Sequence, residues 1–189
     1  MDNTEESLFQ LALTEFIGED KNEQSKLVYS YLGLAIFWAQ CIEQTFENML
    51  ILEQVANKEG VTEDFIDTIY DKTDASKATM GRQINDVKKV YSISDEHVKE
   101  LKSVLDKRNF LAHKFFKVYS FKFFSEQGKL EMIEECTHFV EKTQSLDAKL
   151  NDYYEEYKAK IGITEDLIQR LIKQAEEKEI ERVKNKYDS

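Results

Sequence analysis

Apolar residues recur at spacings of three and four along almost the whole chain, which is the pattern of amphipathic helices. The clearest example runs from about Ser25 to Lys58, where the apolar side extends from Leu27 to Leu52. Strict alternation, the pattern of a half-buried strand, never lasts beyond about seven residues. We therefore predict an all-α fold, an antiparallel helical bundle with one long central helix and an extra helix at the C-terminus.

Helix starts are indicated by a Ser or Thr that precedes a helical pattern, because its hydroxyl can accept a hydrogen bond from a free backbone amide. Three such candidate N-caps are Thr62, Ser76 and Ser94. Further helices are expected at about 7–17 and 129–160. The stretch 118–124 alternates weakly, so a short extended piece, a loop and a frayed helix end all remain open.

Gly162 divides the chain into two parts. Residues 1–162 are expected to form the bundle, and residues 163–189 a charged amphipathic helix. The apolar stripe of this last helix requires cover, which either the bundle or another chain can supply.

Composition narrows the choice of fold and partner. The 189 residues include no proline and only six glycines, too few chain-turning residues for a sandwich or barrel. The formal net charge of −11 has the wrong sign for a protein that binds nucleic acid over its whole surface, so any such contact must be local. No pair of histidines or cysteines has metal-ligand spacing, and neither a metal nor another cofactor is predicted.

The cysteines, the first residues and the longest apolar stretch indicate where in the cell the protein is expected. Cys41 and Cys136 form no disulfide framework and are expected to be small hydrophobic residues in a reducing environment. The first residues are acidic and lack a signal-peptide pattern, and the longest apolar stretch is too short to span a bilayer. We expect a cytoplasmic protein without a membrane partner.

One motif carries chemistry: Arg108 is followed, after four residues, by His113. Histidine's unperturbed pKa of about 6.5 suits the imidazole of His113 to moving protons near neutral pH. The guanidinium of Arg108 suits the charge that develops on phosphate oxygens. Five residues along an ideal helix turn through about 500°, which leaves the two side chains about 140° apart. Either the helix ends or bends near His113, or Arg from one chain works beside His from another.

The segment KRNFLAHKFF around this motif resembles the motif helix of the HEPN family of small all-α proteins, many of which are metal-independent ribonucleases. KATMGRQI upstream resembles the preceding helix, and the segment around Glu43 resembles the family's long helix. The resemblance covers roughly residues 25–160. It implies that Arg108 and His113 line a cleft completed by a second protomer, with Asn109 supporting them and Glu43 as a weaker candidate for support. Where some HEPN toxins have a tyrosine, this chain has Phe115.

Local charge favours the same region. From Lys99 to Lys122 the chain has seven basic and two acidic residues, a basic island in an acidic protein. Lys107, Lys114 and Lys117 are therefore candidate RNA-binding residues. The aromatic residues between 110 and 124 either stack unpaired bases or pack on the bundle or a dimer partner.

The first hypothesis is a metal-independent endoribonuclease of HEPN type that acts as a homodimer on RNA and leaves a cyclic phosphate. The resemblance further implies a toxin or a phage-defence effector, restrained by an antitoxin protein or a regulatory RNA. A second hypothesis is a non-catalytic helical module that uses the same basic cleft to bind RNA, a nucleotide or a protein. A third is a dimeric scaffold whose last helix recruits another chain.

Overall fold

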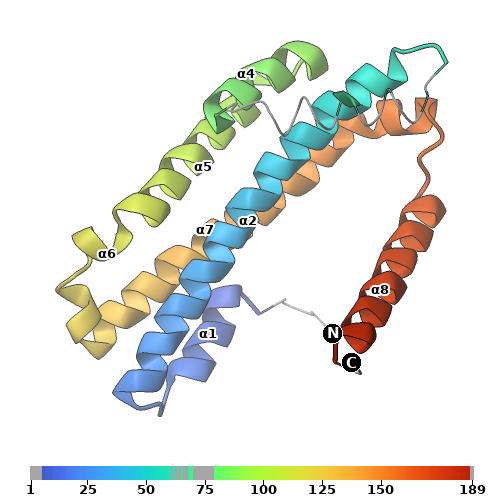
Figure 1. Cartoon of the computed structure of the whole chain (residues 1–189). Coiled ribbons are helices and arrows are strands. Elements are labelled where there is room, and N and C mark those ends of the chain that lie inside the picture. The colour runs from blue at the N-terminus through green and yellow to red at the C-terminus, as the bar shows by residue number, and fades with distance from the viewer. Residues whose placement is uncertain (1–5, 61, 63–64, 66–67, 70–78, 188–189) are drawn as a thin grey trace, which may run out of the picture.

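The computed structural model describes residues 6–60, 62, 65, 68–69 and 79–187, although it does not place the side chains of residues 171, 175 and 187. Within these residues all regular structure is helical, which confirms the all-α fold. Two long helices form its spine: α2 (Lys21–Ala56) is the expected central helix, and α7 (Glu126–Lys160) lies beside it (Figure 1).

The two long helices run parallel. Near one end the Nζ of Lys129 donates to the carbonyl of Lys21, and near the other end the Nζ of Lys160 donates to the Oδ1 of Asn57. Their contact forms most of the core, in which aliphatic, aromatic and sulfur side chains are fully buried. Buried residues of this contact include Ile42, Phe46, Met49, Met132, Ile133 and Val140. The parallel direction requires a return path, and a helix between α2 and α7 supplies it.

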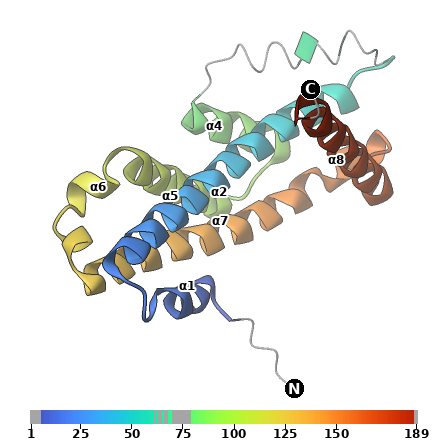
Figure 2. The ribbon, with the colours of Figure 1, turned by 60° about the horizontal axis from the view of Figure 1, so that its bottom comes forward.

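The return is made by α5 (Asp95–His113), which runs antiparallel to both long helices, whereas α4 (Met80–Tyr91) before it runs in the same direction as α2 (Figures 1 and 2). The hydroxyl of Tyr91 donates to the carbonyl of Met49 and ties the end of α4 to α2. The hydroxyl of Ser94 caps α5 by accepting from the amide of His97, as predicted.

The two other candidate caps have different outcomes. The hydroxyl of Thr62 accepts from the amide of Phe65 at 3.2 Å. The predicted start at Ser76 lies outside the described residues, and α4 begins after Thr79. A short helix α1 (Leu8–Phe16) precedes α2 and covers part of α7, where the amide of Leu8 donates to Glu141.

One end of the bundle is built from short helical pieces. Lys114, with φ −129° and ψ −15°, interrupts the helix directly after His113. A single turn, α6 (Phe115–Val118), and a 3₁₀ turn, η1 (Lys122–Phe124), follow. We call residues 114–124 the tip. The stretch 118–124 is thus a helix end followed by a turn, and it is not extended. The next helix, α7, begins at Glu126, three residues earlier than expected, because the hydroxyl of Ser125 caps it.

Gly128 fixes how the tip lies on α7. A Cβ at this position would lie 2.7 Å from the carbonyl carbon of Lys122 and still closer to its oxygen, so only a glycine permits this approach. Gly128 is also buried and donates its amide to Ser125. The backbone of η1 therefore rests directly on the first turn of α7.

The last helix, α8 (Glu165–Tyr187), projects from the end of the bundle opposite the tip (Figures 1 and 2). Gly162, with φ +74°, makes the turn that separates it from α7. Its first turn contributes Ile168 to an apolar groove with Ile51 and Val55. Every described side chain from residue 169 to 186 is exposed. Pairing with another chain therefore remains a prediction for this helix.

Gly128→Ala is expected to reduce the free energy of unfolding by about 1–3 kcal/mol, because the added methyl group must displace the backbone of Lys122. Gly33→Ala is the matched control, since its Cβ meets no atom within 4 Å in the middle of α2. The control should gain about 0.5–1 kcal/mol from helix propensity. Urea denaturation followed by circular dichroism measures both; equal effects of the two substitutions would contradict the close approach at Gly128.

Candidate functional site

Arg108 is oriented by two side chains. On α5 it faces α2, where its Nη2 donates to Oε1 of Glu43. Its Nη1 donates to Oδ1 of Asn109 at 3.0 Å. The side chains of Arg108 and Glu43 are 30% and 24% exposed, so the pair is partly shielded and held more firmly than a surface ion pair. The structure thus brings together three of the predicted site residues.

These three residues line a groove of about 470 Å³. Its walls come from α2, α4 and α5, and from Thr79 before α4. Gln83 and Glu47 close one side, where Nε2 of Gln83 donates to Oε1 of Glu47 at 3.2 Å. A ligand in this groove would meet amides, carboxylates and one guanidinium, a set suited to polar recognition.

The groove is less basic than the sequence suggests. Two carboxylates, Glu43 and Glu47, line it together with the guanidinium of Arg108. Burial raises the pKa of Glu43, Arg108 opposes that shift, and Glu47 adds to it. Protonation of Glu43 is therefore easier than for an exposed glutamate, and it would free Arg108 for an anionic ligand.

His113 lies outside this groove. It is the last residue of α5 and is exposed to solvent. Because the helix continues through it, the offset of about 140° from Arg108 is retained. Among the described residues, no hydrogen bond or ion pair engages its side chain. A single chain therefore does not place the guanidinium and the imidazole in one cavity.

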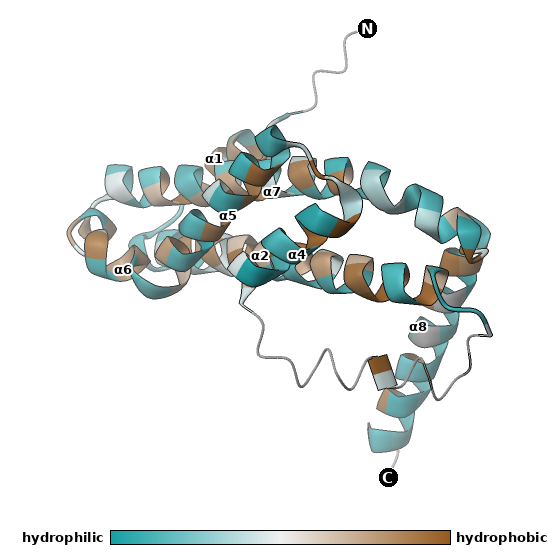
Figure 3. Ribbon diagram, turned by 90° about the horizontal axis from the view of Figure 1, so that it is seen from above, coloured by the Kyte–Doolittle hydropathy of each residue, from teal (hydrophilic) through white to brown (hydrophobic). Residues whose placement is uncertain are grey.

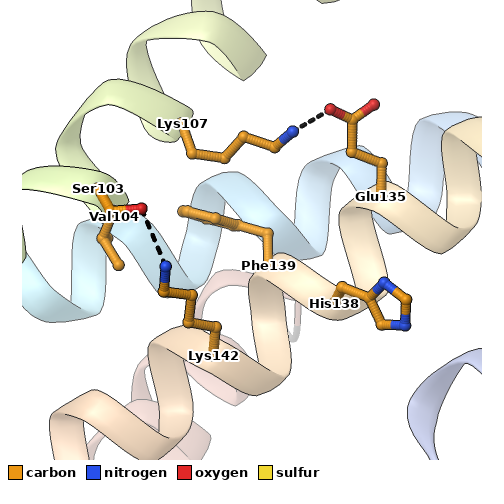
Figure 4. A pocket seen from close by; sticks show the side chains of 7 residues that line it. All are labelled: Ser103, Val104, Lys107, Glu135, His138, Phe139 and Lys142. Carbon is orange, nitrogen blue, oxygen red and sulfur yellow. Dashed lines mark hydrogen bonds and ion pairs between the residues drawn. The ribbon is translucent and has the colours of Figure 1, made fainter. Parts of the chain in front are cut away.

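The three candidate lysines divide into two groups. Lys107 turns away from Arg108 toward α7, forms an ion pair with Glu135, and lies 5.0 Å from the ring centre of Phe110 (Figure 4). Burial and the nearby carboxylate of Glu135 raise the pKa of Tyr119 to about 12. Lys107 is thus part of the packing between α5 and α7.

Lys114 and Lys117 lie in the tip and are exposed. In the described part of the chain, neither side chain takes part in a hydrogen bond or an ion pair. They are available to a phosphate backbone and follow His113 closely in the sequence. Two lysines of the basic island that lie close to His113 are therefore unpaired in the described part of the chain, and Lys107 is not one of them.

A second cavity, of about 330 Å³, lies between α5 and α7 beside Lys107. Phe139 forms part of its wall, and the Nζ of Lys142 donates to the hydroxyl of Ser103 at 2.9 Å (Figure 4). Sequence reasoning did not find this cavity, because it depends on the pairing of two helices remote in the chain. It also missed Glu47 and Gln83 in the first groove. The signal for Glu47 is its position one helical turn after Glu43.

No family model, curated protein or solved structure matches the chain. The HEPN resemblance therefore depends on the residues of this chain alone. No described helix is long and apolar enough to cross a membrane. Over the ranges that the structure describes, no three His, Cys, Asp or Glu side chains lie close enough to share a metal ion. The functional argument therefore depends on the geometry around Arg108 and His113.

Glu43→Gln is expected to change the pH dependence of stability. Because the folded protein raises the pKa of Glu43, the wild type loses stability as pH rises through that pKa, above about 4.5. The variant has no such group, so its free energy of unfolding relative to wild type should rise between pH 4 and pH 7. Urea denaturation at both pH values measures this; a relative stability that falls with pH would show that the ionised Glu43–Arg108 pair dominates instead.

Proposed function

We propose that this protein is a metal-independent endoribonuclease of HEPN type that acts as a homodimer. Support comes from Arg108, which Glu43 and Asn109 hold at an open groove, together with an unengaged imidazole at the end of the same helix. A guanidinium has five donors, and two of those on Arg108 are used, so three remain for a phosphate. This restrained guanidinium is the observation that carries the proposal.

In the proposed reaction, His113 accepts the proton of a ribose 2′-hydroxyl, and the 2′-oxygen attacks the adjacent phosphorus. The bond from phosphorus to the 5′-oxygen breaks, and that oxygen receives a proton from water, to which the imidazolium of His113 then returns the proton that it took. The products are a 2′,3′-cyclic phosphate and a 5′-hydroxyl. Arg108 stabilises the charge that collects on the non-bridging oxygens. Asn109 and Glu43 act as positioning residues, because they contact the guanidinium and hold its plane.

The separation of the two groups supports the proposed homodimer. One chain holds Arg108 in a groove and presents His113 outside it, and a second chain would bring an imidazole to that guanidinium. In this arrangement each dimer contains two composite sites. The biological role that we propose with it is that of a toxin or phage-defence effector, held in check by an antitoxin protein or a regulatory RNA.

A second candidate is a non-catalytic module that binds RNA, a nucleotide or a protein partner. The observation that favours it is the groove itself, which in a single chain contains Arg108, Asn109 and Gln83 but no histidine. Such a groove can recognise a polar ligand without a group that moves protons at neutral pH, unless Glu43 takes that role. This candidate predicts binding without cleavage.

Purified protein with labelled RNA in EDTA tests the first candidate. Wild type should cleave, and His113→Ala should slow cleavage by about 10²- to 10⁴-fold, the usual worth of acid–base assistance. Arg108→Ala should reduce the rate by a similar factor. The matched controls are His138→Ala, an exposed histidine on α7, and Arg182→Ala on α8. A loss well below tenfold for His113→Ala would show that a different group carries the proton, whereas intact RNA with wild type would favour the binding module.

Mixing the two inactive variants tests the composite site. If Arg108 of one chain works with His113 of the other, a mixed dimer has one fully intact site and one site that lacks both groups. An equal mixture of Arg108→Ala and His113→Ala chains, unfolded and refolded together, should therefore recover about a quarter of wild-type activity. Native mass spectrometry measures the fraction of mixed dimers. No recovery in the presence of mixed dimers would place both groups of a site in one chain.

A further inference from the structure

The two most exposed large hydrophobic side chains of the described residues lie in the tip. Phe121 and Phe124 are 87% and 82% exposed, although phenylalanine is among the residue types most often buried. Phe116 and Val118 beside them are also exposed. The ribbon around α6 accordingly includes strongly hydrophobic positions at the very end of the bundle (Figure 3). An exposed patch of this kind marks a surface that meets a partner.

Other aromatic rings of the same region pack against one another. Phe110, Phe115 and Tyr119 contact one another, with ring centres 5.3–6.2 Å apart, and Phe115 is fully buried. Phe116 and Phe123 lie 5.8 Å apart, and each lies 5.6 Å from Tyr29 of α2. The alternatives for the aromatic cluster are thus divided between its members: some pack on the bundle, while Phe121 and Phe124 face solvent.

The charge of this surface identifies the chemistry of its partner. Of the basic residues in the tip, Lys114 and Lys117 are exposed and form no ion pair in the described part of the chain, whereas Lys122 pairs with Glu131. Exposed lysines between exposed aromatic rings form the combination that binds single-stranded nucleic acid: the rings stack on bases, and the lysines meet the phosphates. Lys114 and Lys117 lie between His113 and the two rings along the chain.

A membrane surface fits the same end less well. The turn that enters α2 is adjacent to the tip, because Lys129 contacts both the carbonyl of Lys21 and the ring of Phe123. This turn carries acidic residues, including Asp20, which a flat anionic bilayer would have to approach. A single strand can follow the basic segment and avoid them.

We propose that Phe121 and Phe124 form a stacking platform for unpaired bases of the RNA substrate, next to the phosphate that His113 acts on. The inference extends the proposed function, since it takes RNA as the ligand. Gly128 keeps the platform in place, because the backbone of η1 rests on α7 there. The platform selects single-stranded RNA, because the bases of a duplex are stacked on one another and cannot reach the rings.

Binding of a labelled oligouridine with 2′-O-methyl riboses, measured by fluorescence anisotropy in EDTA, tests the platform. This probe lacks the 2′-hydroxyl and cannot be cleaved. A double substitution of Phe121→Leu and Phe124→Leu keeps apolar bulk but removes the rings, and it should weaken binding at least tenfold. The matched double substitution to Tyr keeps the rings and should retain affinity. Both positions are exposed, and an unchanged circular dichroism spectrum confirms folding.

Each result decides the matter. Equal affinity of the Leu variant and wild type, or no binding of the single strand by wild type, overturns the platform. So does preference for a duplex of the same sequence, or a lower oligomeric mass in the Leu variant alone, which would make the rings a protein contact. Cleavage separates this inference from the proposed function. Ring-dependent binding without cleavage would support the platform and reject the nuclease. Cleavage with an unchanged KM in the Leu variant would support the nuclease and reject the platform.

Discussion

The parallel packing of α2 against α7 is the constraint from which the arrangement of the molecule follows. Two neighbouring helices that run in the same direction cannot be joined by a short turn, so the chain has to travel back along their length, about 50 Å. The helix that runs back is α5. This places the C-terminal half of α5 beside α2, and it is there that Arg108 meets a glutamate 65 positions earlier. The motif therefore lies on the returning helix, which contacts α2 through Arg108 and α7 through Lys107.

The contacts of Arg108 have two opposite effects on ligand binding. Asn109 and Glu43 restrict the guanidinium, so a ligand would meet a side chain that has already lost much of its rotational freedom. Glu43 also competes for the same charge. Since burial makes ionisation of Glu43 less favourable than in water, the competition is weaker than the formal charges suggest. A polyanion nearby would weaken it further, because negative potential stabilises the protonated carboxyl.

Local patterns in the sequence predicted the parts of the fold that local forces determine. The cap at Ser94, the apolar side of α2 and the turn at Gly162 depend on neighbours within a few residues, and all three were found as expected. The direction in which each side chain points around a packed helix depends instead on contacts between helices that are remote in the sequence. Lys107 and Arg108 are adjacent in sequence and about 100° apart around α5, so one faces α7 and the other α2. Composition alone assigned both to one basic surface. Only the packing of α5 between two helices separates them.

The missing side chain at Gly128 has a mechanical consequence. With no atom between η1 and α7 to yield under load, the two backbones move together, and the tip behaves as an extension of the longest axis of the molecule. A tilt of the first turn of α7 would therefore displace Phe121 and Phe124 together with it, so the orientation of these rings depends on the N-terminal end of that helix.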